Sequence, residues 1–166
     1  MLTDKLKERF GADLIGVTTT HGEETISVAR DRAPQILRAL RDEPAFAFNF
    51  LTDLSAVDWD NRKPRFDVVY HLNSLTLGHR LRVKIGVEAS DPSVASVVEL
   101  WKAADWLERE CFDMFGIIFT GHPDLRRILL YDTFEGHPLR KDYPATRRQP
   151  IVPEIDPVTN PRRSSR

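Results

Sequence analysis

The stretch from residue 66 to residue 87 reads FDVVYHLNSLTLGHRLRVKIGV, and it holds the strongest structural signal in the sequence. Apolar and polar residues alternate over two runs, separated by a short polar turn that ends in Gly78. The alternating apolar positions are Phe66, Val68, Tyr70 and Leu72 in the first run and Leu81, Val83, Ile85 and Val87 in the second. A period of two predicts strands with one buried face, and the short connection predicts a hairpin.

Weaker signals precede this hairpin. Phe46, Phe48 and Phe50 alternate in the same way and predict a third strand. Because sequential strands usually lie side by side, we expect a meander. Asp31 is the expected cap of a helix near the N-terminal third of the chain. The elements predicted in that third are helices over 3–10 and 31–41 and strands near 14–18 and 25–29.

A long helix is predicted after the hairpin, over residues 91–116. Asp91-Pro92 is a helix start signal, and Gly116 suits the position just after a helix end. The pattern leaves room for a break between Leu100 and Trp101. The apolar stripe expected to face the core consists of Leu100, Ala104, Leu107, Cys111 and Met114. The charge ladder expected on the opposite side consists of Asp105, Arg109 and Asp113.

The composition is that of one ordinary globular domain. Of 166 residues, 41% are hydrophobic and 30% charged, and the formal net charge is −1. Such a balance lacks the excess of Lys and Arg that a nucleic-acid-binding surface needs. We expect a single α+β domain over residues 1–144, with a mostly antiparallel or mixed sheet packed against helices. Residues 145–166 are expected to form an extended Pro/Arg-rich C-terminal arm.

The cysteine content and the N-terminal sequence bear on the cellular compartment of the protein. Cys111 is the single cysteine, so the chain can form no internal disulfide and lacks the ligands of an iron–sulfur cluster. The N-terminus mixes acids with bases and has no apolar core of a signal peptide, and no apolar run approaches a membrane span. We therefore expect a protein of the reducing cytoplasm that reaches a membrane only through other subunits.

Two clusters of polar residues could carry chemistry. Glu110 and Asp113, beside Glu108 on the same predicted helix, could act as a general acid and base, or could form a solvated or ion-paired helix face. Metal ligands could come from Cys111, His122 and His137. The alternative for Cys111 is that of a small hydrophobe on the apolar stripe.

A near-repeat follows the predicted long helix. Residues 121–123 and 136–138 both read Gly-His-Pro, and each is followed by Leu and a basic pair. Glycine permits an unusual backbone angle and proline fixes the next one, so each turn would present its Leu and its basic pair in a defined direction. The sequence leaves two interpretations open, ordinary solvated loops or a docking surface. The aromatics of this half are either buried or outward-facing interface residues: Trp101, Trp106, Phe112, Phe115 and Tyr143.

Three ordered segments together carry a family resemblance. They are ERECFDMFG (108–116), GHPDLRRIL (121–129) and GHPLRKDYP (136–144). This string resembles the signature of the C subunit of respiratory complex I, which is the 30 kDa subunit of NADH–quinone oxidoreductase. The motif-rich part spans roughly residues 99–144, and the upstream order of strands and helices is compatible with the family.

The resemblance implies a structural and assembly subunit of the peripheral arm of a translocase that moves electrons from NADH to quinone and couples this to proton translocation. It implies no catalytic residue and no cofactor in this chain, with FMN and Fe-S clusters held by partner subunits. The partners would chiefly be homologues of the B and D subunits of complex I, on the cytoplasmic side of a bacterial inner membrane. The partner-interface candidates are Arg126, Arg127, His137, Leu139, Arg140, Lys141 and Tyr143.

Two alternative functions remain open at the level of sequence. The first is a homologous subunit of a membrane-bound hydrogenase or of another donor–quinone oxidoreductase. The second is a stand-alone acid–base hydrolase that uses Glu110, Asp113 and His122.

Overall fold

A mixed five-stranded sheet forms the centre of the protein, as seen in a computed structural model that describes residues 2–149. The strand order is β1-β2-β5-β4-β3, with β2 and β5 parallel and every other neighbouring pair antiparallel. The strands are β1 (Leu14–Thr20), β2 (Glu23–Val28), β3 (Phe50–Asp58), β4 (Phe66–Ser74) and β5 (His79–Val87). The expected meander is confirmed for β3, β4 and β5.

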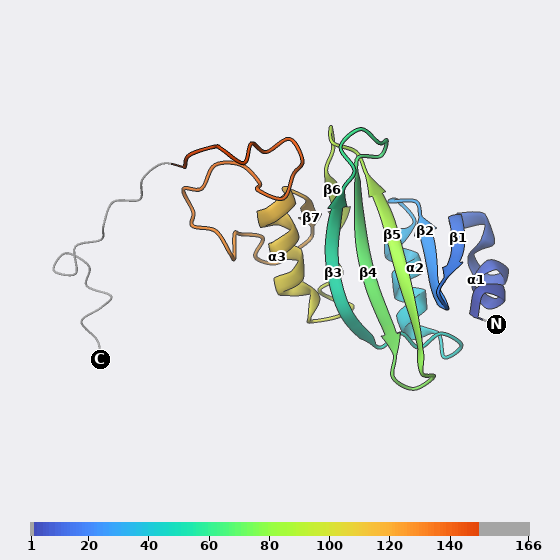
Figure 1. The fold of residues 1–166 in the computed structure, drawn as a ribbon. Coiled ribbons are helices and arrows are strands. Elements are labelled where there is room, and N and C mark those ends of the chain that lie inside the picture. Colours follow the sequence, from blue (N-terminus) through green and yellow to red (C-terminus); the bar gives the residue numbers. More distant parts are fainter. Residues whose placement is uncertain (1, 150–166) are drawn as a thin grey trace, which may run out of the picture.

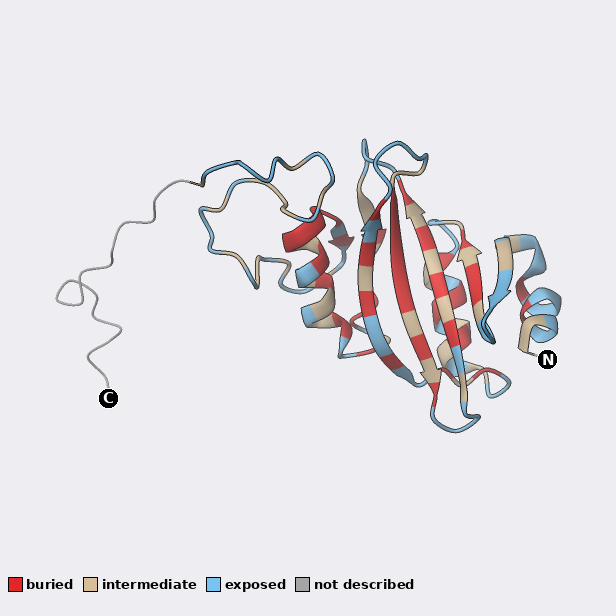
Figure 2. Ribbon diagram, viewed as in Figure 1, coloured by how far each residue is buried: buried red, intermediate tan, exposed pale blue. Residues whose placement is uncertain are grey.

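The hairpin predicted from the first quoted stretch is confirmed. β4 pairs with β5 from Phe66 opposite Val87 to Ser74 opposite His79, and the predicted apolar positions face one another across the ladder. Tyr70, for example, lies opposite Val83, and both are fully buried. Figure 2 shows buried and half-buried positions alternating along most of β5, whereas the first five residues of β4 are all buried. The connecting turn also carries two exposed apolar residues, Leu75 and Leu77.

Helices cover this sheet on one face and at one edge. α2 (Ala33–Asp42) lies against a face of the sheet, and α3 (Ala104–Phe115) lies beside the edge strand β3 (Figure 1). The remaining elements are α1 (Leu2–Phe10), the 3-10 turn η1 (Gly11–Asp13), and the short parallel strands β6 (Ser93–Ala95) and β7 (Ile118–Thr120). Asp31 was expected to cap α2, but the cap position falls on Arg32, which makes no side-chain cap hydrogen bond.

The strand predicted from Phe46, Phe48 and Phe50 is wrong for its first two residues. Phe46 and Phe48 are buried, yet they lie in a loop in which Ala47 has a φ of +47°. The N–H of Phe48 donates to the Leu40 carbonyl at 2.9 Å, so it bonds to the end of α2. Alternating burial therefore arises here from a loop that bonds to the end of α2, and the regular strand begins only at Phe50.

The helix predicted over 91–116 is also wrong in its first half. Residues 93–95 form β6, which pairs in parallel with β7, and the helix begins at Ala104. Tight turns between these elements use the Val97 carbonyl, which accepts from the N–H groups of Leu100 and Trp101. Because the backbone bonds of this segment go to β7 and to turns, the Asp-Pro signal marks the start of a strand. The end at Gly116, with a φ of +71°, is confirmed.

The predicted α+β class is confirmed, with one hydrophobic core between the sheet and the helices. No helix within residues 2–149 is both long and apolar enough to cross a bilayer. Most of the predicted C-terminal arm lies outside the described residues, so the division into a domain over 1–144 and an arm over 145–166 stays a prediction.

Candidate functional site

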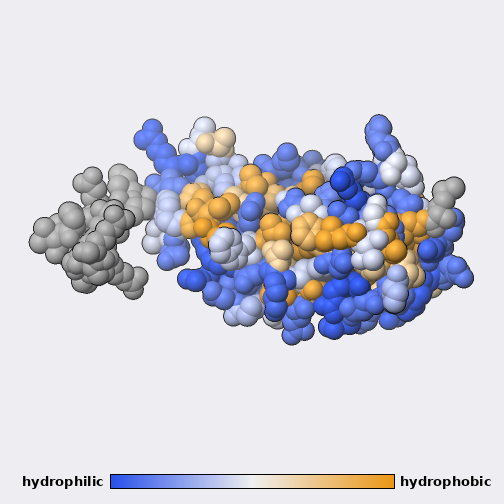
Figure 3. Space-filling model, turned by 90° about the horizontal axis from the view of Figure 1, so that it is seen from below, coloured by the Kyte–Doolittle hydropathy of each residue, from blue (hydrophilic) through white to orange (hydrophobic). Residues whose placement is uncertain are grey.

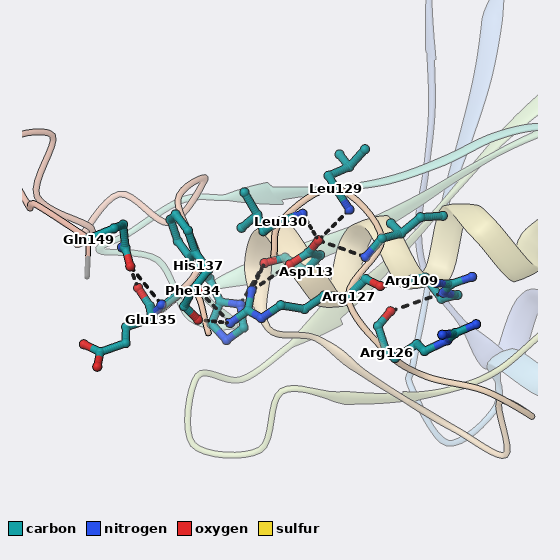
Figure 4. Close-up of polar contacts among 12 residues, drawn as sticks. Arg109, Asp113, Arg126, Arg127, Leu129, Leu130, Phe134, Glu135, His137 and Gln149 are labelled. Carbon is teal, nitrogen blue, oxygen red and sulfur yellow. Dashed lines mark hydrogen bonds and ion pairs between the residues drawn. The ribbon is translucent and has the colours of Figure 1, made fainter. Parts of the chain in front are cut away.

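The segment after β7, residues 121–149, is held in place by a carboxylate of α3. Asp113 is fully buried, and its Oδ2 accepts hydrogen bonds from the consecutive backbone N–H groups of Ile128, Leu129 and Leu130 at 2.8–3.0 Å (Figure 4). Its Oδ1 accepts from Arg127 Nη1 at 2.6 Å. A single side chain thus fixes four donors of an otherwise irregular segment, which we call the post-helix segment.

Arg127 extends this anchor to the next turn. Its Nη2 donates to the carbonyl oxygens of Phe134 and Gly136 at 3.0 and 3.1 Å. Burial alone would raise the pKa of Asp113, but the Leu130 N–H, the Arg127 guanidinium and the next two N–H groups together hold it below its usual range. The carboxylate therefore stays ionised in its buried position, where charge-assisted hydrogen bonds are stronger than neutral ones.

The two Gly-His-Pro turns both attach to α3 through their histidines. His122 Nε2 lies 3.1 Å from the Asp105 carbonyl oxygen, and His137 Nδ1 lies 2.9 Å from the Asp113 carbonyl oxygen. Gly121 and Gly136 have φ values of +83° and +92°, as the sequence predicted. Each Gly-His-Pro turn is therefore attached to α3 through its histidine, one turn near each end of the helix.

A second carboxylate holds the far end of the segment. Asp58, at the end of β3, accepts the Lys141 backbone N–H at 2.8 Å and forms two hydrogen bonds with Arg65. Those hydrogen bonds from Arg65 hold the pKa of Asp58 well below its usual range. Arg65 also donates to Asp142 at 2.9 Å, so residues 141 and 142 are tied to the sheet.

Close packing at the end of α3 leaves no room for a side chain. A Cβ placed on Gly116 would lie 2.6 Å from atoms of both His137 and Arg140. Arg140 Nε donates to the Phe115 carbonyl, and its guanidinium lies over the Phe66 ring. The Leu139 N–H donates to the Met114 carbonyl at 3.1 Å. Residues 137–140 thus satisfy carbonyl groups that the helix end leaves free.

The outer surface of the post-helix segment combines apolar and basic side chains. Leu129 and Leu139 are 61% and 52% exposed, and the Arg126 side chain is 70% exposed. In Figure 3 hydrophobic side chains gather toward the left of the coloured part of the molecule, the side on which Figure 1 places this segment. Trp106, on the exposed side of α3, is 69% exposed. Exposed apolar residues next to arginines are typical of protein–protein contact surfaces.

The predicted interface candidates fall into two groups. Arg126, Leu139 and Lys141 are exposed and available to a partner. The other four are half-buried with contacts inside the chain: Arg127, His137, Arg140 and Tyr143. Tyr143, for example, stacks on Phe134 with ring centroids 6.2 Å apart.

The sequence did not indicate the two anchors. Asp113 was expected on a solvated charge ladder or in an acid–base pair, and it is buried among the donors of the post-helix segment. Asp58 carried no signal, because its partner Lys141 lies 83 residues away. The Gly-His-Pro pattern after a helix could have indicated turns that pack against that helix. It could not have indicated which carboxylate accepts their hydrogen bonds.

The two chemical interpretations can be compared with this geometry. Glu110 is exposed, whereas Asp113 and the fully buried His122 side chain are engaged in the contacts described above. Within residues 2–149 no group of three or more His, Cys, Asp or Glu side chains could hold a metal ion. Cys111 lies in the core, as the apolar stripe predicted, and its burial raises the pKa of the thiol.

Comparison with known proteins identifies relatives along most of the chain. Residues 26–149 match the family model described as the respiratory-chain NADH dehydrogenase, 30 Kd subunit. The C subunit of the NADH-quinone oxidoreductase of Citrifermentans bemidjiense is 50% identical over 140 residues, which cover 84% of this chain and 86% of that protein. The protein of the same name from Roseiflexus sp. is 48% identical over 141 residues, which cover 85% and 81%.

Two solved structures share the fold. A trypsin-resistant fragment of Nqo5 superposes with a TM-score of 0.67 at 35% identity, covering 75% of this chain and 98% of the fragment. A chain of an archaeal membrane-bound sulfane sulfur reductase superposes with a TM-score of 0.71 at 23% identity, covering 87% of this chain and 85% of that one.

Proposed function

This chain belongs to the family of the 30 kDa subunit of the respiratory-chain NADH dehydrogenase, and we propose that it is a cofactor-free structural subunit in the peripheral arm of an NADH-quinone oxidoreductase. Its partners would chiefly be homologues of the B and D subunits of complex I. The complex would sit on a bacterial inner membrane, with this chain on the cytoplasmic side. FMN and Fe-S clusters would belong to the partners, and quinone reduction coupled to proton translocation to the whole complex.

The observation that carries this proposal is the construction of the post-helix segment. Two ionised carboxylates, Asp113 and Asp58, fix an irregular segment to α3 and to the sheet. Side chains that project from it, such as Leu129 and Leu139, are left exposed. Such a fixed surface loses little conformational freedom on binding, so more of the contact energy is available to hold a partner.

Rigid positioning is itself useful in an electron-transfer assembly. A subunit that holds cofactor-bearing partners in register contributes to turnover without touching a reacting atom. In this account no residue of the chain has a catalytic role, and the anchors Asp113 and Asp58 act by positioning the docking surface.

A deletion and complementation experiment tests the proposal. Removing the gene should abolish assembly of the peripheral arm and NADH–quinone activity of membranes, and the wild-type gene should restore both. A Leu129→Asp, Leu139→Asp double variant should fail to restore them although the purified variant folds normally. Ile15→Asp, which changes an equally exposed apolar residue on β1, serves as the control and should complement fully. Assembly of an active arm without this chain would contradict the proposal.

A second candidate places the chain in another membrane-bound oxidoreductase, such as a hydrogenase. The fold that it shares with a chain of the sulfane sulfur reductase complex makes this candidate worth testing. The relatives that are about 50% identical to this chain are named as C subunits of NADH-quinone oxidoreductase, which favours the first candidate. The electron donor oxidised by the complex that co-purifies with the tagged chain decides between the two.

A further inference from the structure

Trp59 is an exposed aromatic residue that contacts within the chain hold in one position. It follows β3 directly and is 48% exposed. Its indole Nε1–H donates to Asp67 Oδ2 at 2.9 Å, and the Arg62 guanidinium lies over its ring, 4.8 Å from the centroid. Because the polar group of the indole is already bonded, the ring surface that stays exposed is apolar. Val57, two residues earlier on β3, is also exposed and extends this apolar surface.

A buried acid beneath the loop fixes the residues around Trp59. Asp67 is buried, and its Oδ1 accepts a hydrogen bond from Arg62 Nη2. Arg62 Nε also donates to the Pro64 carbonyl at 3.1 Å, and the Trp59 N–H donates to the Arg65 carbonyl at 3.0 Å. A side chain held by such contacts has little rotamer freedom left to lose when a partner covers it.

The loop that carries Trp59 lies beside the post-helix segment. Asp58, the residue before Trp59, accepts the Lys141 N–H at 2.8 Å, and Arg65 donates to both Asp58 and Asp142. Figure 1 shows the loop between β3 and β4 at the end of the sheet that the post-helix segment also reaches. Trp59 therefore borders the proposed docking surface, and a partner that covers Lys141 can also cover Trp59.

The unpaired charge around Trp59 is positive. The two buried acids at this end of the sheet, Asp58 and Asp67, are each paired with an arginine. The unpaired charges at the surface are Lys63 and Lys141 against Asp60, and none of these three side chains forms an ion pair within residues 2–149. An acidic partner surface complements this excess.

We propose that Trp59 is a binding hot spot of this subunit, and that it enters an apolar pocket with acidic side chains at its rim on the partner that covers the post-helix segment. This inference rests on the proposed function and deepens it by stating the chemistry of the partner. Tryptophan, with arginine beside it, is among the side chains most often found at such positions. A second copy of the chain fits less well, because a symmetric contact would bring the unpaired lysines of both copies together.

Oxidative footprinting tests the inference on the protein in its complex. The tagged full chain is exposed to hydroxyl radicals, once alone and once within the complex that co-purifies with it, and oxidised peptides are measured by mass spectrometry. Trp101, which is buried in the fold, gives the level expected for a covered indole. Trp59 should be oxidised well above that level in the free chain and should fall to it in the complex.

Three outcomes of the footprinting would overturn the inference. Equal oxidation of Trp59 in the two states would do so, and the proposed function would still stand if the same preparation oxidises NADH with quinone. Protection of Trp59 already in the free chain would show that no partner subunit is needed to cover it. Recovery of the chain alone would overturn the proposed function and this inference with it.

Substitutions separate binding from folding. Trp59→Ala should lower the recovery of partner subunits by about tenfold or more, with melting of the purified chain as the check on its fold. Lys63→Glu changes an exposed side chain that forms no ion pair within the described residues, so it should leave melting unchanged and still lower recovery. Lys5→Glu makes the same charge change on α1 and should keep full recovery. Full recovery with a folded Trp59→Ala chain, or equal recovery for the two lysine variants, would contradict the proposal.

Discussion

Lys141 donates its backbone N–H to the carboxylate of Asp58, 83 residues earlier in the chain, at a distance of 2.8 Å. Asp113 holds Ile128, Leu129 and Leu130 near the other end of the same segment. Neither contact is local, so the conformation of the post-helix segment depends on the finished sheet and on α3. The docking surface is therefore a product of the tertiary fold.

Asp113→Asn should destabilise the chain strongly. The substitution removes the charge that faces Arg127 and leaves either the guanidinium or the three N–H groups without an acceptor, because the amide presents donors on one side. Breaking a buried ion pair of this kind costs on the order of 3 kcal/mol, or about 10 °C in melting temperature for a domain of this size. Differential scanning calorimetry measures the shift. The unfolding free energy of the exposed control Glu110→Gln should stay within about 0.5 kcal/mol of wild type. An equal effect of the two substitutions would contradict the role of Asp113 as an anchor.

Gly116→Ala and Gly121→Ala form a matched pair. Both residues have positive φ, so both substitutions carry a conformational cost of roughly 1 kcal/mol. A methyl group on Gly121 meets nothing within 4 Å, whereas on Gly116 it displaces His137 and Arg140. We expect the free energy of unfolding measured in urea to fall by about 1–2 kcal/mol more for Gly116→Ala than for Gly121→Ala, because the displaced His137 and Arg140 lose their hydrogen bonds. Equal losses would show that the close packing at Gly116 is unimportant.

Arg140 and Lys141 should separate internal stability from partner binding. Arg140→Glu loses the bond to the Phe115 carbonyl and the contact over Phe66, so it should lower the melting temperature of the isolated chain. Lys141→Glu changes an exposed side chain, whose backbone N–H still reaches Asp58, and should leave melting unchanged while weakening recovery of partner subunits. An unchanged melting temperature for Arg140→Glu would mean that its contacts inside the chain contribute little.

Acid should release the post-helix segment before it unfolds the sheet. The pKa values of Asp113 and Asp58 are both lowered in the folded state, so their stabilisation is present above their ordinary pKa and is lost as the pH falls through the folded values. Amide hydrogen exchange, corrected for the intrinsic rate, should therefore show falling protection at residues 128–130 below about pH 4. Amides of β4 and β5 should stay protected there. Simultaneous loss at both places would argue against separate anchoring.

The parts of the fold that follow from local pattern were predictable. The apolar residues Phe66, Val68, Tyr70 and Leu72 of β4 recur with a period of two, as do those of β5, and only one register buries both apolar sets. Gly116 likewise marks a helix end through its own backbone angle. Phe46 and Phe48 show the limit of such reasoning, since burial with a period of two also arises in a loop whose N–H groups bond to a helix end.

The candidate site was predictable only in outline. The two Gly-His-Pro sequences predicted two turns of defined direction, and their glycines adopt the positive φ values that the sequence implied. The partners of those bends could not be inferred, because Asp113 has the spacing of a solvent-facing residue on α3 and becomes buried only when the segment folds over it. The helix prediction for residues 91–103 was wrong for a related reason. The local sequence favours a helix, but this stretch contains β6, which pairs with β7.

The most direct test of the account is purification of a tagged copy of the full chain from mild-detergent extracts of its own cells. We predict that the wild-type chain brings down a complex that contains flavin and iron–sulfur absorption and oxidises NADH with quinone. The Leu129→Asp, Leu139→Asp variant should come down alone, without colour or activity. Recovery of the wild-type chain alone, or turnover by the lone chain, would contradict the claim that its function lies in the surface it offers to partners.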